Sequence, residues 1–312
     1  MHMKLRFIHA FIIGAALPLF AEDEPQRPHI TGLSHIALYV HDLEKSRAFY
    51  KDFLGCGEPY SLPDTNGGVH LTFIKINDRQ SIELFPGSET NTDRLNHIAI
   101  QTDDAGAMRA YLAARGVKVP AKVAKGRIGN LNFNILDPDG HQVEIVQYLP
   151  DGWTVREQGN FMPAARISAR LKHVGIIVTN LAASLKFYHA VLGFQETWRG
   201  TRNTNQLSWV NLKVPDGDDY IELMLYKELP PPEKRGNAHH LSLEVADIEK
   251  AKVALEARPA FTNYARPLQI QTGVNRKRQM NLFDPDGTRV ELMEAQTVDG
   301  IAAPSSAAPP PN

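Results

Sequence analysis

Two histidines and two glutamates recur at matched places in each half of the chain. Each histidine precedes its glutamate by between 47 and 51 residues, and each interrupts an apolar stretch. One such residue in a strand is more often part of an exposed face, but eight matched positions indicate metal binding. The sequence therefore predicts a four-ligand metal site in each half, from His35, Glu83, His97 and Glu144 in the first and from His173, Glu222, His240 and Glu291 in the second.

The donor types narrow the ion and the chemistry. Imidazoles and carboxylates without a thiolate suit a borderline or hard divalent ion, so we expect Ni, Zn, Co, Mn or Fe(II). Four protein ligands on an octahedral ion leave two positions, which a substrate with two neighbouring oxygens can fill. The ion would act as a Lewis acid and stabilise an enolate or enediolate. A carboxylate that loosens from the ion would serve as the base, a role we assign to Glu144 and Glu291.

Two questions about these sites stay open in the sequence. His239 directly precedes His240, and alignment with Asn96-His97 favours His240 as the ligand, whereas a shift of one residue would make it His239. The ligands of one site can also come from one half of the chain, or from units exchanged between halves or between chains. The similar spacings fit each of these pairings.

The elements that must position the ligands repeat about every 140 residues. Short β-branched runs at Leu33–Val40 and Leu171–Val178 carry a histidine at the third place, and an amphipathic helix pattern follows each and ends at Gly55 or Gly193. Two strand patterns come next, and a weaker copy of the whole order then follows in each half. The sequence therefore predicts an α+β protein of four βαβββ units in two pairs.

Strand alternation gives the ligands a common face. His35, Ala37 and Tyr39 share one side of their strand, while the apolar residues between them share the other. We expect the apolar side to pack on a helix and the histidine side to line the inside of a curved sheet. Small residues lie beside the ligand histidines and leave room for an ion and a substrate: Ala37, Ala99, Gly175 and Ser242.

These residues resemble the vicinal oxygen chelate superfamily, which includes glyoxalase I, extradiol dioxygenases, fosfomycin-resistance proteins, bleomycin-binding proteins and methylmalonyl-CoA epimerase. The resemblance covers about residues 31–148 and 169–296. It rests on the histidine strand openings, the Ser-x-x-Phe-Tyr helices at Ser46 and Ser184, and the Asp-Pro-Asp-Gly-x-x-x-Glu endings at Glu144 and Glu291. It implies two tandem domains with curved mixed sheets, and the four-ligand set looks most like that of glyoxalase I.

Three functions are consistent with this resemblance. The first is a metal-dependent lyase or isomerase of glyoxalase type, acting on a small substrate that chelates the ion through neighbouring oxygens. The second is an extradiol ring-cleavage dioxygenase, which would use mainly the second half. Such enzymes usually carry a tyrosine three residues before the Asp-Pro turn, where this chain has Asn134 and Asn281. The third is a binding protein without catalysis, similar to bleomycin-resistance proteins, although those lack the ligands.

The rest of the sequence indicates the location, the domain boundaries and the partners of the protein. Residues 1–21 read as a signal peptide, with Lys4 and Arg6 before an apolar run, so we expect a periplasmic or secreted protein without membrane contact after cleavage. The net charge of −1 gives no argument for nucleic acid. We expect domains at 31–149 and 169–297, a linker at 150–168 with a short helix, and a disordered tail at 298–312. A small molecule is the expected partner, and the protein a monomer or homodimer.

Overall fold

A computed structural model of the chain describes residues 24–87, 89, 93–202, 205–236 and 238–311. It contains two eight-stranded mixed sheets, one from each half of the chain. The first has the strand order β2-β3-β4-β1-β5-β8-β7-β6, and the second has β10-β11-β12-β9-β13-β16-β15-β14. The α+β class and the two-sheet organisation are thus confirmed. Each half builds its own sheet, so units are not exchanged between halves.

The elements follow the predicted order. The first half contains β1 (Ile30–Val40), α1 (Leu43–Arg47), a π-helical turn η1 (Ala48–Phe53), β2 (Ser61–Pro63), β3 (Val69–Lys75), β4 (Ser81–Pro86), β5 (Leu95–Thr102), α2 (Ala105–Ala114), β6 (Ala124–Lys125), β7 (Leu131–Leu136) and β8 (Gln142–Gln147). The linker carries the expected short helix, α3 (Trp153–Arg156). The second half contains β9 (Leu171–Val178), α4 (Leu181–Leu185), a π-helical turn η2 (Lys186–Val191), β10 (Gln195–Gly200), β11 (Trp209–Lys213), β12 (Tyr220–Leu225), a 3-10 turn η3 (Pro232–Lys234), β13 (His240–Val245), α5 (Ile248–Glu256), a 3-10 turn η4 (Pro259–Asn263), β14 (Ile270–Thr272), β15 (Lys277–Phe283) and β16 (Arg289–Thr297).

The four helices that follow the unit-opening strands begin with the same device. A side-chain oxygen of the residue before each helix accepts a hydrogen bond from a free backbone N–H of the first turn, and these residues are Asp42, Asp104, Asn180 and Asp247. The helices that we predicted to end at Gly55 and Gly193 change to π geometry in their second half. This wider turn still buries Tyr50 and Tyr188 completely.

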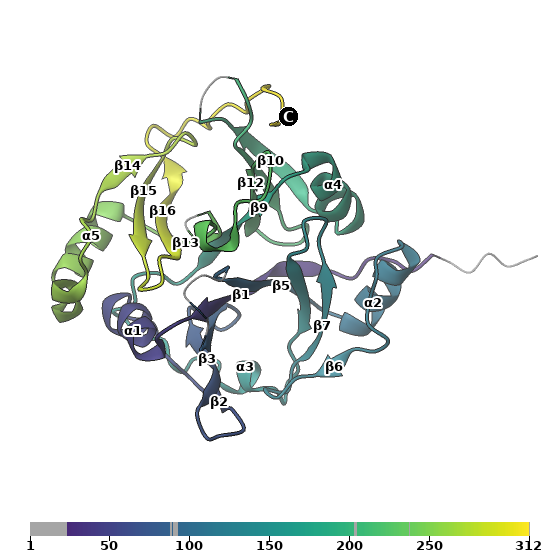
Figure 1. Ribbon diagram of the computed structural model, residues 1–312, viewed down its shortest axis with the longest axis horizontal. Coiled ribbons are helices and arrows are strands. Elements are labelled where there is room, and N and C mark those ends of the chain that lie inside the picture. The colour runs from purple at the N-terminus through teal and green to yellow at the C-terminus, as the bar shows by residue number, and fades with distance from the viewer. Residues whose placement is uncertain (1–23, 88, 90–92, 203–204, 237, 312) are drawn as a thin grey trace, which may run out of the picture.

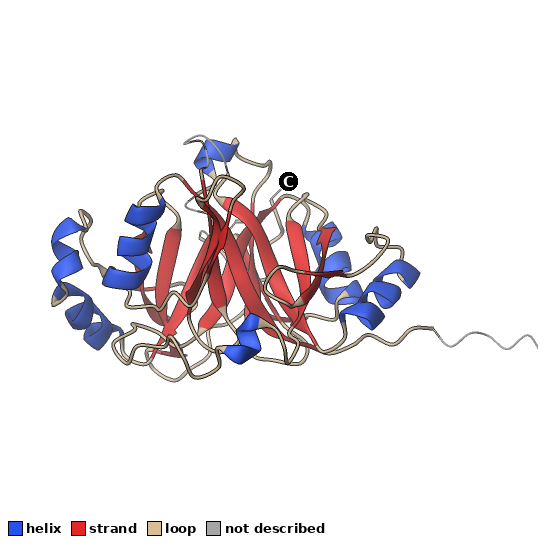
Figure 2. Cartoon of the chain, turned by 90° about the horizontal axis from the view of Figure 1, so that it is seen from below, coloured by secondary structure: helices blue, strands red, loops and turns tan. Residues whose placement is uncertain are grey.

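The helices lie on the outside of the two sheets. Figure 1 shows α1 beside α5 at one side and α4 near α2 at the other, and Figure 2 shows the strands gathered between these two groups. Ile36, Leu38 and Val40 are fully buried on the helix side of β1, as alternation predicts. The opposite side of the same strand, which carries His35, faces the inside of the sheet.

Two matched hydrogen bonds join the halves. The hydroxyl of Tyr50 donates to Asp284 and that of Tyr188 donates to Asp137, each over 3.0 Å. Both aspartates open the Asp-Pro-Asp-Gly turn of the other half. The ring of Phe53 also stacks on that of Tyr264, with 4.8 Å between ring centroids. The halves therefore share one continuous apolar core.

The C-terminal tail differs from the prediction of disorder. The backbone N–H of Ser306 donates to the carbonyl of Arg199 in β10, and the carbonyl of Pro309 accepts from Leu207. Strand β10 is a sheet edge whose free backbone groups can pair with a passing segment, which the composition of the tail does not reveal. The proposed signal peptide lies outside the described residues, and no described helix is long and apolar enough to cross a membrane.

Candidate metal centres

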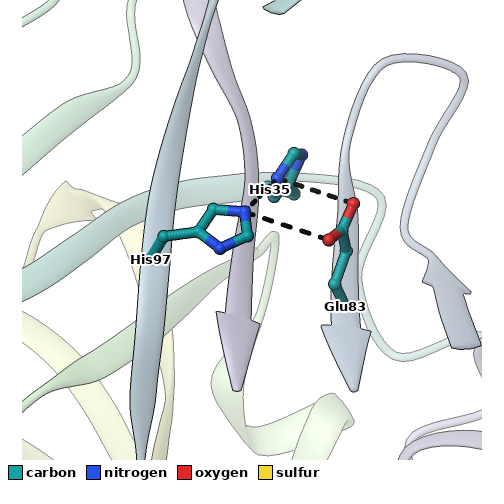
Figure 3. Close-up of side chains that lie close together, drawn as sticks. All are labelled: His35, Glu83 and His97. Atoms are coloured by element: carbon teal, nitrogen blue, oxygen red, sulfur yellow. Dashed lines mark hydrogen bonds and ion pairs between the residues drawn. The ribbon is translucent and has the colours of Figure 1, made fainter. Parts of the chain in front are cut away.

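The four predicted ligands of the first half converge on one point inside its sheet, and Figure 3 shows three of them, His35, Glu83 and His97. The Nε2 atoms of His35 and His97 lie 2.9 Å apart. A carboxylate oxygen of Glu144 lies 3.0 Å from both of these nitrogens. The carboxylate of Glu83 lies on another side, 3.5 Å from His35 and 3.9 Å from His97. All four side chains are buried, so the donors face one another rather than solvent.

The strand register explains why these residues meet. Ala37 of β1 lies between Glu83 of β4 and His97 of β5 in one row of the sheet. In the neighbouring row Ala99 lies between His35 and Glu144. Each alanine thus separates two ligands in its row. The long side chains of these ligands reach toward each other over the methyl group of the alanine. The second half repeats this pattern, with Gly175 between Glu222 and His240 and with Ser242 between His173 and Glu291.

In the first half, the second nitrogen of each histidine has an oxygen partner. Nδ1 of His97 lies 2.8 Å from Oδ1 of Asn96, and Nδ1 of His35 lies 3.0 Å from Oγ of Ser34. The hydroxyl of Tyr148 contacts the same Oγ at 2.5 Å. An acceptor at Nδ1 keeps the proton there and leaves the Nε2 lone pair free for a metal ion. The surroundings of His97 in particular favour the ligating tautomer.

Burial and close charges shift the pKa values of the first cluster. Burial lowers the pKa of His35, but the carboxylates of Glu83 and Glu144 outweigh it and hold that pKa above its usual value. Burial alone would raise the pKa of Glu144, whereas hydrogen bonds from His35 and His97 lower it to about 2. Burial raises the pKa of Glu83. A cation at this point would replace the protons that now balance two buried carboxylates.

A cavity of about 360 Å³ opens onto the first cluster. Its wall combines aromatic and polar side chains, including His70, Phe73, Asn134 and Tyr148. His70 has no counterpart in the second half by sequence, and the structure places it in this wall rather than among the ligands. The volume suits a small organic molecule that reaches the ligands from one side.

The second cluster has the same outline with different spacing. The Nε2 atoms of His173 and His240 lie 3.0 Å apart, with Glu291 at 3.3 Å from the former and Glu222 at 3.5 Å from the latter. The guanidinium of Arg289 lies 2.8 Å from Nδ1 of His240. A cavity of about 290 Å³ opens here, lined by Trp198, Arg202, Trp209, Glu222, Asn281 and Arg289 among others.

The electrostatics of the second cluster also differ from the first. Burial, together with the charge of Arg289, holds the pKa values of His173 and His240 well below normal. Burial and the neighbouring Glu291 raise the pKa of Glu222 to about 8. The metal-free cluster therefore keeps neutral imidazoles and a protonated glutamate near neutral pH.

Both donor sets fit a divalent ion. Three residues of each half place one donor atom each within 4.8 Å of one another, namely His35, Glu83 and His97, and His173, His240 and Glu291. The fourth predicted ligand, Glu144 or Glu222, adjoins its cluster. Neutral nitrogen and anionic oxygen donors facing one buried point form the set that such ions bind. The predicted divalent-metal cofactor is thus confirmed.

The structure also resolves the register question and adds residues that we had not predicted. His239 is buried but points toward Asp93, 3.5 Å away, so His240 is the residue in the cluster. We missed Arg289, although it stands two residues before Glu291 and therefore on the same face of β16. Reading the alternate positions around each ligand would have found it. We also did not predict the support that Ser34 and Tyr148 give to His35.

Comparison with known proteins places these two sites in context. The model of the Glyoxalase/Bleomycin resistance protein/Dioxygenase superfamily matches residues 32–145 and 170–292. Bovine mitochondrial methylmalonyl-CoA epimerase is 31% identical over 105 residues, which is 30% of this chain and 59% of the epimerase. A manganese-dependent 2,3-dihydroxybiphenyl 1,2-dioxygenase of Geobacillus genomosp. 3 is 28% identical over 180 residues, 53% of this chain and 54% of the dioxygenase. The chain thus spans little more than half the length of either relative.

Solved structures agree on the fold. The Mn(II)-bound glyoxalase from Novosphingobium aromaticivorans superposes with a TM-score of 0.65 and 19% identity, over 86% of this chain and 83% of that protein. The family model matches most of the chain in two consecutive segments, and each segment corresponds to one sheet with its ligand cluster. The chain therefore belongs to the Glyoxalase/Bleomycin resistance protein/Dioxygenase superfamily and contains two tandem domains of that fold.

Proposed function

We propose that the protein is a metal-dependent lyase or isomerase of glyoxalase type. Its substrate would be a small molecule that binds a divalent ion through two neighbouring oxygens and carries an acidic C–H bond beside a carbonyl. The observation that carries this proposal is the second buried carboxylate in each cluster, Glu83 beside His35 and His97 and Glu222 beside His240. Two carboxylates allow one to hold the ion while the other moves a proton.

The chain's own residues would divide the work in the first half. His35, His97 and one glutamate would hold the ion, which supplies a Lewis acid for the substrate carbonyl when bound. The other glutamate would take the proton from carbon and return it. Our sequence prediction gives this role to Glu144, and to Glu291 in the second half. Glu83 is the competing base, because it lies farther from both imidazoles than Glu144 does.

Manganese is the ion that we propose first, since a relative over 180 residues is named as manganese-dependent. The donor set accepts Zn, Ni, Co or Fe(II) as well. The proposal also includes export to the periplasm or outside the cell, a small-molecule partner, no nucleic acid, and a monomer or homodimer. Protease accessibility in intact cells would test the location of the protein. Its molar mass, measured by light scattering, would test whether it is a monomer or a homodimer.

A second candidate is an extradiol dioxygenase, favoured by the same relative. The residue that distinguishes the two candidate functions is the cross-strand partner of the glutamate in the last strand of each half. Asn134 pairs with Glu144 and Asn281 with Glu291 across adjacent strands, at the place where the resemblance leads us to expect tyrosine in a dioxygenase. This substitution is why we rank the lyase or isomerase first.

The test uses the full chain loaded with Mn(II), Ni(II) or Zn(II), with metal content measured before activity. Three probes separate the candidates: the hemithioacetal of methylglyoxal and glutathione, methylmalonyl-CoA with proton exchange at its acidic carbon, and 2,3-dihydroxybiphenyl with oxygen consumption. We expect proton exchange or isomerisation, lost in Glu144→Gln if Glu144 is the base and in Glu83→Gln if Glu83 is. Oxygen consumption with a catechol would replace this proposal by the dioxygenase, and absence of bound metal would overturn both.

A further inference from the structure

The two metal clusters differ by one fixed charge. Gln142 stands two residues before Glu144 in β8, and Arg289 stands two residues before Glu291 in β16. Both side chains line the cavity of their own half. With two glutamates and a divalent ion, the first cluster is electrically neutral, whereas Arg289 leaves the second with one positive charge. The second cavity is therefore suited to a ligand that carries a negative charge.

Arg289 also conflicts with the way in which His240 must bind a metal ion. Nδ1 of His240 lies 2.8 Å from the guanidinium of Arg289, which can only donate, and 2.8 Å from the carbonyl of Ala238, which can only accept. One ring nitrogen cannot serve both at once. When it accepts from Arg289, the neutral ring carries its proton on Nε2, the atom that faces His173 and Glu222. That tautomer has no lone pair for the ion.

The other tautomer releases the metal-binding atom. With its proton on Nδ1, His240 donates to the carbonyl of Ala238 and its Nε2 lone pair is free. Arg289 must then leave Nδ1 and find another partner. In the first half the corresponding contact is the oxygen of Asn96 beside His97, which favours the ligating tautomer. His97 in the first cluster therefore already favours the tautomer that binds a metal ion. His240 in the second cluster reaches that tautomer only after Arg289 moves.

The second cavity has an unused hydrogen-bond donor for such a partner. Among the described residues, Nε of Arg289 is shielded from solvent and has no hydrogen-bond partner. Arg202 lies over the ring of Trp209 at the same cavity, 5.6 Å from its centroid. A planar guanidinium with free N–H groups matches the two oxygens of a carboxylate. The two tryptophans supply an apolar wall for the body of the ligand.

We propose that the second cluster is a binding site for a small carboxylate, and that Arg289 couples this ligand to the metal ion. The carboxylate takes the guanidinium away from His240, the ring proton moves from Nε2 to Nδ1, and the ion binds at the freed nitrogen. By linkage, the ion tightens carboxylate binding by the same factor. This inference rests on the proposed metal function of the second half and assigns its ligand class.

The experiment isolates each cluster within the full chain. His35→Ala removes a ligand of the first cluster, so Mn(II) titration of that variant by electron paramagnetic resonance reports the second cluster. Benzoate is the anionic probe, and benzamide at equal ionic strength is the neutral control. We expect benzoate to tighten Mn(II) binding about tenfold or more, because one fixed positive charge near the ion is neutralised. Benzamide should change nothing.

Matched exchanges at the two corresponding positions complete the test. In His35→Ala combined with Arg289→Gln, Mn(II) should bind about tenfold more tightly without benzoate, and benzoate should have no effect. In His173→Ala, where the first cluster remains, Gln142→Arg should weaken Mn(II) binding and create a benzoate effect. Nitrogen NMR of histidine should find the proton of His240 on Nε2 in the metal-free protein and on Nδ1 after Arg289→Gln.

The outcomes separate two kinds of failure. Mn(II) binding to the second cluster that ignores benzoate, or a benzoate effect that survives Arg289→Gln, would overturn the coupling while leaving the metal site intact. An unchanged affinity in Gln142→Arg would also count against it. No Mn(II) binding in His35→Ala with Arg289→Gln and benzoate present would overturn the metal function of the second half, and the coupling with it.

Discussion

The ring of His240 occupies the space that a side chain at Gly175 would need. A β-carbon on Gly175 would lie 1.9 Å from Cε1 and 2.1 Å from Nδ1 of His240, far inside van der Waals contact. The corresponding pair in the first half is Ala37 and His97, which accommodates a methyl group. The two clusters thus share their ligands and their register but not the depth at which one imidazole sits.

Gly175→Ala should therefore displace His240 and weaken the second metal site. We expect affinity for Mn(II) at that site to fall roughly ten- to a hundredfold, the range found when the support of a metal ligand is disturbed. Titration in the His35→Ala background measures it. Ala37→Gly is the matched control and should keep the first site, at a cost of up to about 1 kcal/mol in folding stability. Equal Mn(II) affinity in Gly175→Ala and its parent would contradict the close packing.

Asn96 should matter for metal binding although it donates nothing to the ion. Its side-chain oxygen lies 2.8 Å from Nδ1 of His97 and keeps the proton on that atom. Asn96→Ala should lower Mn(II) affinity of the first site about 10- to 100-fold, whereas Asn96→Asp retains the acceptor and should bind normally or more tightly. Calorimetric titration in the His173→Ala background checks this. A loss of equal size in both variants would mean that the residue acts through packing instead.

The ligands were predictable because their pattern is redundant. Each ligand lies in a strand whose residues alternate between the apolar side, which packs on helices, and the side that faces the inside of the sheet. Glu144 and Glu291 also stand at the same distance along the chain after an Asp-Pro-Asp-Gly turn. Curvature and register then follow from four equivalent units. What the spacing could not supply was the choice between pairings within and between halves, because equal loops permit both.

The features that we missed depend on contacts rather than on local pattern. Strand β10 is largely exposed and polar, so it has no alternation to read, and its pairing partner on the open side is a Pro-rich tail. Arg289 reads as an ordinary charged residue until β16 is placed beside β13, where it pairs with His240. Individual positions at edges and beside ligands obtain their role only from the assembled sheet.

The matched Tyr50–Asp284 and Tyr188–Asp137 hydrogen bonds, two of the contacts that join the halves, should contribute separately to stability. Tyr50→Phe and Tyr188→Phe each remove a buried donor to a carboxylate, and each should cost about 1–3 kcal/mol in the free energy of unfolding. The pairs share no partner, so the double variant should lose the sum. Urea denaturation followed by circular dichroism measures this, with metal content as the control for an intact site. A double variant no less stable than either single one would contradict this independence, because it would mean that loss of one contact already removes the contribution of the other.

Glu58 should make the folding stability of the protein fall measurably at acidic pH. Burial would raise its pKa, but hydrogen bonds from Arg47, Lys51 and Thr72 outweigh burial and lower the pKa to about 2, against 4.5 for the free group. The folded carboxylate binds its proton less tightly than the unfolded one, so it stabilises the fold above pH 4.5 and loses this effect as the pH falls toward 2.

Glu58→Gln tests this contribution directly. Because Arg47 and Lys51 are partly exposed, solvent screening limits the gain, and we expect the variant to be less stable by on the order of 1 kcal/mol at pH 7. The difference from the parent should shrink as the pH is lowered from 5 toward 3, because only the parent then takes up the extra proton on unfolding. Urea denaturation at each pH measures both. Asp52→Asn, which alters an exposed carboxylate in η1, is the control for nonspecific charge effects. A stability difference that stays constant across this range would exclude the proposed role of ionised Glu58, since a purely steric effect of the substitution does not titrate.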